Sequence, residues 1–289
     1  MDMFKGSGVA IVTPFNEDYS IDYEGLEKLL NWHVKEKTDA IIITGTTGEA
    51  STLTNKEHLD VIEFAVKVID GRIPVIAGTG SNDTLHMVYL SQESERLGVD
   101  ALLCVTPYYN KATQEGLYLH FKAVADAVNI PIILYTVPSR TNVEIELDTV
   151  IRLSKLDNIV GIKDATGNLE YTESITKSLL GFYLYSGNDD MIYDVLERGG
   201  HGVISVVANI KPYETHRLVQ AYLDGDKVAS KKTQDDMQNL ISQLFTEPNP
   251  IPVKYAMDKM KLVDNGRLRL PLTELSEQYR EALEGVLHD

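Results

Sequence analysis

Lys163 occupies a place where an apolar run would be expected to continue. The residues before it, 159–162, read IVGI, so a charged amine directly follows a stretch with the character of a buried strand. Most lysines in such a place extend their amine into water. A lysine held in a low-dielectric site instead has a lowered pKa, and its neutral amine is the nucleophile that forms Schiff bases with carbonyl substrates.

Two other polar side chains could take part in such chemistry. Tyr135 ends the apolar run 131–135, and a phenol beside an amine can relay protons, although a tyrosine at a strand end is more often a core or rim residue. Arg140 follows five residues later. A guanidinium binds a carboxylate in a bidentate fork, whereas a lone arginine in a loop is more often solvated.

The segment GTTGE, residues 45–49, is a candidate site for a carboxylate. It combines small residues, two hydroxyl groups and several backbone N–H groups in one turn, which suits an anion. It lacks the Gly-Lys-Ser/Thr ending of a nucleotide-binding loop. The alternative is an ordinary turn after a strand.

These candidates all follow apolar runs that recur along the chain. Eight runs read as strands, at residues 8–14, 40–45, 74–80, 101–107, 131–137, 159–164, 182–187 and 202–207. Segments with helical periodicity lie between them, such as 55–69, whose start carries a capping box formed by Thr54 and Glu57.

Strands alternating with helices predict parallel pairing, and eight such units predict a closed (β/α)8 barrel, the TIM barrel, over residues 1–225. An open doubly wound sheet is the alternative, but no Gly-rich phosphate turn follows the first run. In a barrel, the carboxyl ends of the strands meet at one face, so Lys163, Tyr135, Arg140 and residues 45–49 should lie together there.

Residues 226–289 continue past the eighth unit. Their helical periodicity is interrupted by TEPNPIP, residues 246–252, and again near Gly266–Pro271, which predicts about three further helices. These helices are not needed to close a barrel. They indicate a small C-terminal all-helical domain or a contact between subunits.

Composition excludes several classes of function. The chain has 27 Lys and Arg against 43 Asp and Glu, a net charge of -16, which argues against nucleic acid and anionic membranes as partners. No apolar run is long enough for a membrane span and no signal sequence is recognisable, so we expect a cytoplasmic protein. Cys104, the single cysteine, reads as a small buried hydrophobe.

Metal and cofactor chemistry have little support in the sequence. Asp189 and Asp190 have no histidine or further carboxylate at ligand spacing, and a helix N-cap or a solvated turn is the expected role. No His-Glu-x-x-His motif, nucleophile elbow or dinucleotide fingerprint is present. We therefore expect no metal and no cofactor.

A set of motifs in order carries a family resemblance. The chain resembles the 4-hydroxy-tetrahydrodipicolinate synthases, also called dihydrodipicolinate synthases, which belong to the class I aldolases and lyases of the N-acetylneuraminate lyase type. The resemblance extends from Gly8 through PNPIPVK, residues 248–254. It is carried by residues 45–49, 78–80, 106–110, 134–141, 161–168 and 199–206.

The resemblance implies roles for the groups that bind pyruvate. Pyruvate would condense with Lys163, and its carboxylate would be held by the hydroxyl and backbone N–H of Thr47 with help from Thr46. Gly187 and the main-chain carbonyl of Ile204 correspond to family positions that line the pyruvate pocket.

The resemblance also implies the proton relay and the second substrate. Tyr135 would shuttle protons through Thr46 to Tyr109, which in the family enters the site of a neighbouring subunit. Arg140 would hold the carboxylate of L-aspartate 4-semialdehyde, and the product would begin the diaminopimelate and lysine branch. The family-based expectation for assembly is a homotetramer made of two tight dimers.

Two departures and one alternative accompany the resemblance. Thr136 replaces the usual Asn after the catalytic tyrosine, from which we expect altered rates but retained activity. Asn55 and His86 replace a histidine and a glutamate of lysine-regulated relatives, which predicts weak or absent inhibition by lysine. N-acetylneuraminate lyase or a 2-keto-3-deoxy sugar-acid aldolase is the alternative function. Arg140 argues against it, because a polyhydroxylated substrate needs no carboxylate clamp there.

Overall fold

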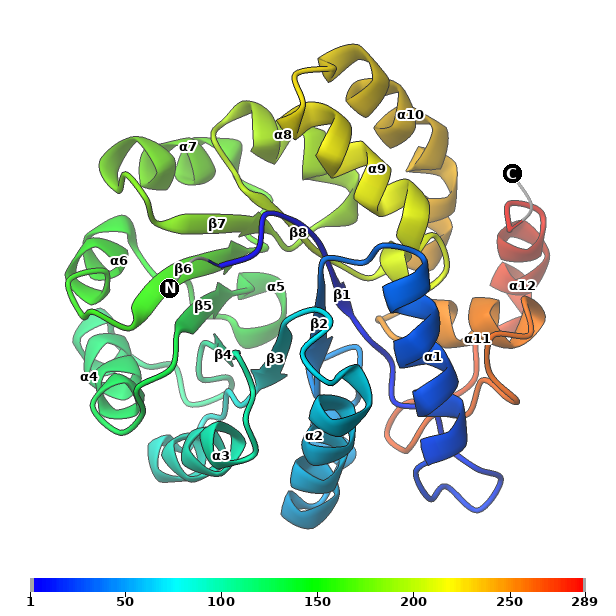
Figure 1. Cartoon of the computed structure of the whole chain (residues 1–289), viewed down its shortest axis with the longest axis horizontal. Helices are drawn as coiled ribbons and strands as arrows, with labels where there is room; N and C mark the ends of the chain where they lie inside the picture. The colour runs from blue at the N-terminus through cyan, green and yellow to red at the C-terminus, as the bar shows by residue number, and fades with distance from the viewer. Residues whose placement is uncertain (1–2, 288–289) are drawn as a thin grey trace.

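The computed structural model describes residues 3–287 and has a closed barrel of eight parallel strands at its centre (Figure 1). Each strand pairs with the next in sequence, and β1 pairs with β8 to close the barrel. The strands are β1 Gly6–Ala10, β2 Ala40–Ile43, β3 Val75–Gly78, β4 Ala101–Val105, β5 Ile132–Thr136, β6 Ile159–Asp164, β7 Tyr183–Ser186 and β8 Gly202–Ser205. The prediction of a (β/α)8 barrel is confirmed.

The strands are mostly apolar because both of their faces are buried, and their polar residues, such as Lys163 and Asp164 on β6, gather toward the carboxyl ends. Successive side chains alternate between the barrel interior and the surrounding helices. The interior cluster includes Ile42, Leu103 and Ile204, while Ile41, Leu102 and Val203 belong to the larger outer cluster that packs against the helices. Cys104 lies in the outer cluster, where burial raises the pKa of its thiol to about 11, in agreement with its reading as a hydrophobe.

The helices surround the barrel in Figure 1. Those of the barrel units are α1 Tyr23–Lys35, α2 Asn55–Ile69, α3 Thr84–Arg96, α4 Gln114–Ala125, α5 Pro138–Thr141, α6 Leu147–Leu153, α7 Leu169–Ser178, α8 Ile192–Glu197 and α9 Pro212–Leu223. The capping box at the start of α2 is present as expected, with Thr54 and Glu57 each bonding the other's backbone N–H. Within residues 3–287, no helix has the length and apolar character needed to cross a membrane.

Three helices follow the barrel units, as the periodicity predicted: α10 Lys227–Leu244, α11 Ile251–Lys259 and α12 Glu277–Glu284. Helix α10 packs against α8 and α9. The chain before and after α11 instead contacts loops at the carboxyl ends of the strands. The C-terminal helices are therefore in contact with the face where a barrel enzyme has its active site.

Candidate active site at the carboxyl ends of the strands

Lys163 and Tyr135 lie side by side inside the mouth of the barrel. They are directly paired in the register of β5 and β6, so their side chains point to the same face of the sheet. Lys163 is 6% exposed, and its Nζ lies 4.4 Å from the centroid of the Tyr135 ring. Strand pairing thus places an amine and a phenol together, as the positions of the two apolar runs suggested.

Burial changes the protonation of both groups. It lowers the pKa of Lys163 to about 8, while the charge of Asp189 opposes this shift and the charge of Arg140 adds to it. Burial raises the pKa of Tyr135, against the effects of the Arg140 charge and a hydrogen bond with Thr46. Near neutral pH, an appreciable fraction of Lys163 is therefore a neutral amine beside a protonated phenol.

Gly187, after β7, allows the lysine chain to pass. A Cβ at this position would lie 3.1 Å from Lys163 Cε and 2.7 Å from the Cβ of Ala165. A larger residue would clash with Ala165 and press on the lysine chain, so the close approach requires glycine here.

The turn at residues 45–49 faces the amine from β2. Thr47 is 2% exposed, and its Oγ1 accepts a hydrogen bond of 2.9 Å from Asn249 Nδ2. Glu49, with φ 55°, closes the turn by donating its backbone N–H to the carbonyl of Thr46 at 3.1 Å. The side chain of Glu49 forms a 2.5 Å ion pair with Lys254, and both side chains are buried.

A cavity of about 580 Å³ joins these groups. Six of the residues predicted for the site line it: Thr46, Thr47, Tyr135, Arg140, Lys163 and Gly187. The other two do not. Tyr109 is 89% exposed and Ile204 is buried in the interior cluster of the barrel. The cavity can hold a small carbonyl compound whose carboxylate faces the turn and whose carbonyl faces Lys163.

The interpretation of Asp189 was wrong. It is 2% exposed, in a short 3-10 helix (η2, Asp189–Met191), and is neither solvated nor the N-cap of that helix. Its Oδ2 accepts hydrogen bonds from the backbone N–H groups of Val206 and Val207, at 3.0 and 2.8 Å. The carboxyl group is therefore buried near Lys163, where burial raises its pKa, and it holds the loop after β8. Its neighbour Asp190 is exposed, as expected for a turn.

Sequence reasoning missed the contribution of the C-terminal helices. Asn249 lines the cavity and bonds Thr47, and its backbone oxygen accepts a 3.2 Å hydrogen bond from Arg140 Nη2. Asn249 belongs to TEPNPIP, the proline-rich interruption of the helical pattern, and Lys254 lies two residues beyond it, on α11. That interruption was the available signal, since polar residues within such a break often have a specific contact.

The other substituted positions also have defined contacts. The Thr136 hydroxyl is fully buried and accepts a 3.4 Å hydrogen bond from the N–H of Ile145. His86 Nε2 lies 2.9 Å from Asn55 Oδ1 at the edge of the cavity, so these two residues bond each other. Within residues 3–287, no group of three or more His, Cys, Asp or Glu is arranged to hold a metal ion.

The fold and the site together define a β/α-barrel protein with a buried amine at the carboxyl ends of its strands. The chain matches the Dihydrodipicolinate synthetase family over residues 3–289. It is 53% identical to a 4-hydroxy-tetrahydrodipicolinate synthase of Caldicellulosiruptor saccharolyticus over 289 residues, which are 100% of this chain and 98% of that protein.

Solved structures agree with this assignment. A dihydrodipicolinate synthase from Acinetobacter baumannii, described as chloride inhibited and complexed with pyruvate, has 47% identity and a TM-score of 0.97, covering 99% of this chain and 98% of that one. A dihydrodipicolinate synthase variant described as monomeric has 39% identity and a TM-score of 0.96. The match covers 99% of this chain and 96% of that one. The chain belongs to the dihydrodipicolinate synthetase family.

Proposed function

We propose that this chain is a 4-hydroxy-tetrahydrodipicolinate synthase that condenses pyruvate with L-aspartate 4-semialdehyde through a Schiff base on Lys163. The full-length family match supports the reaction. The buried Lys163 amine beside the Tyr135 phenol, at the mouth of the barrel, is the observation that carries the covalent mechanism. No cofactor is required, because the protein's own amine supplies the electrophilic iminium.

The reaction begins with attack of the neutral Lys163 amine on the carbonyl carbon of pyruvate. The carbinolamine loses water to give an iminium, and loss of a methyl proton then gives an enamine. Tyr135 is placed to carry protons in these steps, with Thr46 as its hydrogen-bond partner. The pyruvate carboxylate lies against the hydroxyl and backbone N–H of Thr47, in the turn of residues 45–49.

The enamine carbon then attacks the aldehyde of the second substrate, and the new alkoxide takes a proton. The substrate's own amine next attacks the iminium carbon, which closes the ring and releases Lys163. The carboxylate of the semialdehyde is held by Arg140, whose guanidinium is fixed at the rim by the carbonyl of Asn249.

Arg140→Ala separates this function from sugar-acid cleavage. We expect consumption of aspartate semialdehyde to fall about tenfold to a hundredfold in kcat/KM, because a charge-assisted contact of about 1.5–3 kcal/mol is lost. The lysine adduct with pyruvate should still form. Cleavage of N-acetylneuraminate by the wild type, without consumption of the semialdehyde, would contradict the proposal.

We also propose that the active unit is a homo-oligomer, a tetramer of two dimers, in the cytoplasm. The 89% exposure of the Tyr109 side chain supports a role for this residue outside its own subunit. Sedimentation and activity measured over a dilution series test the assembly. A fully active monomer would contradict a shared site.

A further inference from the structure

Asn249 connects the C-terminal helices to both substrate-binding groups of the proposed site. It lies two residues before α11 and is 6% exposed. Its side-chain Nδ2 donates a 2.9 Å hydrogen bond to Thr47 Oγ1, and its backbone carbonyl accepts a 3.2 Å hydrogen bond from Arg140 Nη2. One residue from outside the barrel thus contacts the proposed binding groups of both carboxylates.

The direction of the bond between Asn249 and Thr47 determines what the threonine can do. A hydroxyl has one proton to donate and lone pairs to accept with. Since Thr47 Oγ1 accepts from the Asn249 amide, its own proton remains free to point toward the cavity that Thr47 lines. A hydroxyl held in this way is oriented to donate to an anionic oxygen, here the pyruvate carboxylate.

The position of Asn249 is fixed by contacts to the same turn and to the helix that follows it. Lys254, on α11, pairs with Glu49 at 2.5 Å and also donates to the carbonyl of Arg267 at 2.7 Å. Arg269 donates its backbone N–H to Glu49 Oε2 at 2.9 Å.

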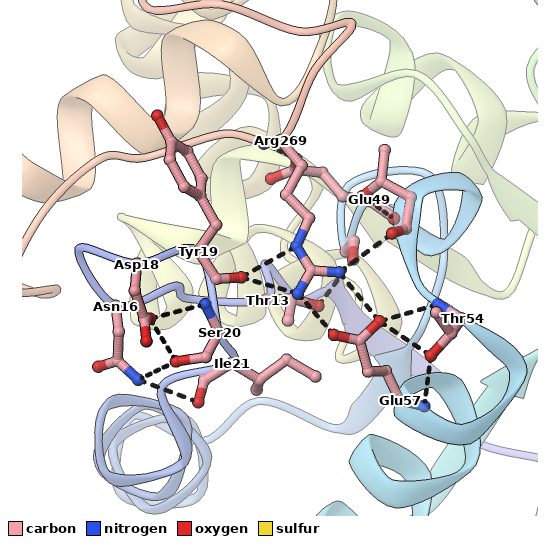
Figure 2. A network of polar contacts seen from close by, with 12 residues as sticks. Thr13, Asn16, Asp18, Tyr19, Ser20, Ile21, Glu49, Thr54, Glu57 and Arg269 are labelled. Atoms are coloured by element: carbon pink, nitrogen blue, oxygen red, sulfur yellow. Dashed lines mark hydrogen bonds and ion pairs between the residues drawn. The ribbon is translucent and has the colours of Figure 1, made fainter.

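The Arg269 guanidinium lies between the carbonyl of Tyr19 and the carboxylate of Glu57 on α2, as Figure 2 shows. The hydrogen bond with Arg269 lowers the pKa of Glu57 to about 2, against the opposing effect of burial and with help from the Thr54 cap, so the pair stays charged over the working pH range. The segments before and after α11 are therefore held against the turn of residues 45–49 by several contacts.

We propose that Asn249 is a positioning residue that orients the Thr47 hydroxyl for the carboxylate of pyruvate. The inference rests on the proposed function and adds a residue of the C-terminal helices to the binding of the first substrate. Asn249 acts through Thr47 and takes no part in the bond-making steps.

The test is a double-mutant cycle between Asn249→Ala and Thr47→Val, read out by the pyruvate concentration that half-saturates borohydride trapping of the lysine adduct. Asn249→Ala should raise this concentration about five- to tenfold, the effect of one hydrogen bond. In the Thr47→Val background, where no hydroxyl remains to be oriented, Asn249→Ala should change it less than about twofold. An equal effect in both backgrounds, or no effect in the wild-type background, would overturn the proposal.

Two further variants keep the outcome clear. Asn158→Ala is the matched control. The Asn158 side chain donates two 2.9 Å hydrogen bonds but lies just before β6, at the other end of the barrel. Its removal should leave pyruvate binding unchanged. If Asn249→Ala does not fold, Asn249→Asp has nearly the same shape but only accepts, so it should take the Thr47 proton and weaken pyruvate binding at least as much. Wild-type affinity in Asn249→Asp would also overturn the proposal. Failure of the proposed function would appear differently, as the absence of any adduct in the wild type.

Discussion

Lys163 and Lys254 are both buried, and burial lowers the pKa of each to about 8, but their surroundings differ. Lys254 has a carboxylate partner in Glu49, a carbonyl partner in Arg267 and the ring of Phe15 at 4.1 Å. Among residues 3–287, the side-chain amine of Lys163 has no ion-pair or hydrogen-bond partner. Its amine lies over the Tyr135 ring and lines an open cavity.

The difference shows that burial alone does not make a lysine reactive. Burial disfavours the charged form of both amines, but at Lys254 the charges and hydrogen bonds around it engage the ammonium and hold it in one place. At Lys163, the carboxyl group of Asp189 accepts hydrogen bonds from the backbone N–H groups of Val206 and Val207 and does not bond the amine. The neutral form of Lys163 is therefore free to react with a carbonyl compound.

Lys254→Met should have the largest effect on stability. It leaves the Glu49 carboxylate buried without its partner, and loss of one member of a buried ion pair typically costs about 3–5 kcal/mol of the free energy of unfolding. Urea denaturation measures this change. The double variant Lys254→Met with Glu49→Leu should recover most of it. A cost below about 1 kcal/mol for the single variant would show that the pair does not hold the turn.

Lys163→Met should change the free energy of unfolding in the opposite direction and stabilise the protein. A buried amine that is largely protonated at pH 7, with no direct partner, opposes folding, so its replacement should raise the free energy of unfolding by about 1–3 kcal/mol. Because the folded pKa lies below that of the unfolded chain, the unfolded state binds more protons between pH 8 and 10.5, and the wild type gains stability there as pH rises. The difference in free energy of unfolding between Lys163→Met and the wild type should therefore become smaller from pH 8 to 10.5. If Lys163→Met were destabilised as much as Lys254→Met, both lysines would stabilise the fold and the proposed difference between them would be wrong.

The rate of adduct formation on Lys163 should depend on pH. Only the neutral amine attacks pyruvate, so at subsaturating pyruvate the rate should rise about tenfold per pH unit well below pH 8 and level off above it. Stopped borohydride trapping across pH 6 to 10 measures the profile. A profile that still rises steeply toward pH 10 would mean that the lysine is not held in a low-dielectric site.

The sequence predicted the barrel because strands and helices depend mainly on local pattern, and eight apolar runs alternate with segments of helical periodicity. It also predicted that Lys163 and Tyr135 meet, since consecutive parallel strands pair and their carboxyl ends share one face. The sequence did not predict the hydrogen bond from Asn249 to Thr47 or the ion pair between Lys254 and Glu49. These contacts join residues 202 and 205 positions apart, and their existence depends on how the C-terminal helices dock.

Asp189 was misjudged for a related reason. Two adjacent aspartates after a strand resemble a solvated turn, and only the folded chain brings the N–H groups of Val206 and Val207 to one of them. Local pattern identifies strand ends and their chemistry. It does not identify which polar groups are buried by elements distant in sequence.

Incubation with pyruvate and borohydride, followed by peptide mass spectrometry, shows whether Lys163 and not the buried Lys254 forms the covalent intermediate. We predict one reduced pyruvyl group per chain, on the peptide that contains Lys163, and none in Lys163→Met. An adduct on Lys254 or another lysine, or no adduct in the wild type, would contradict a Schiff base on Lys163.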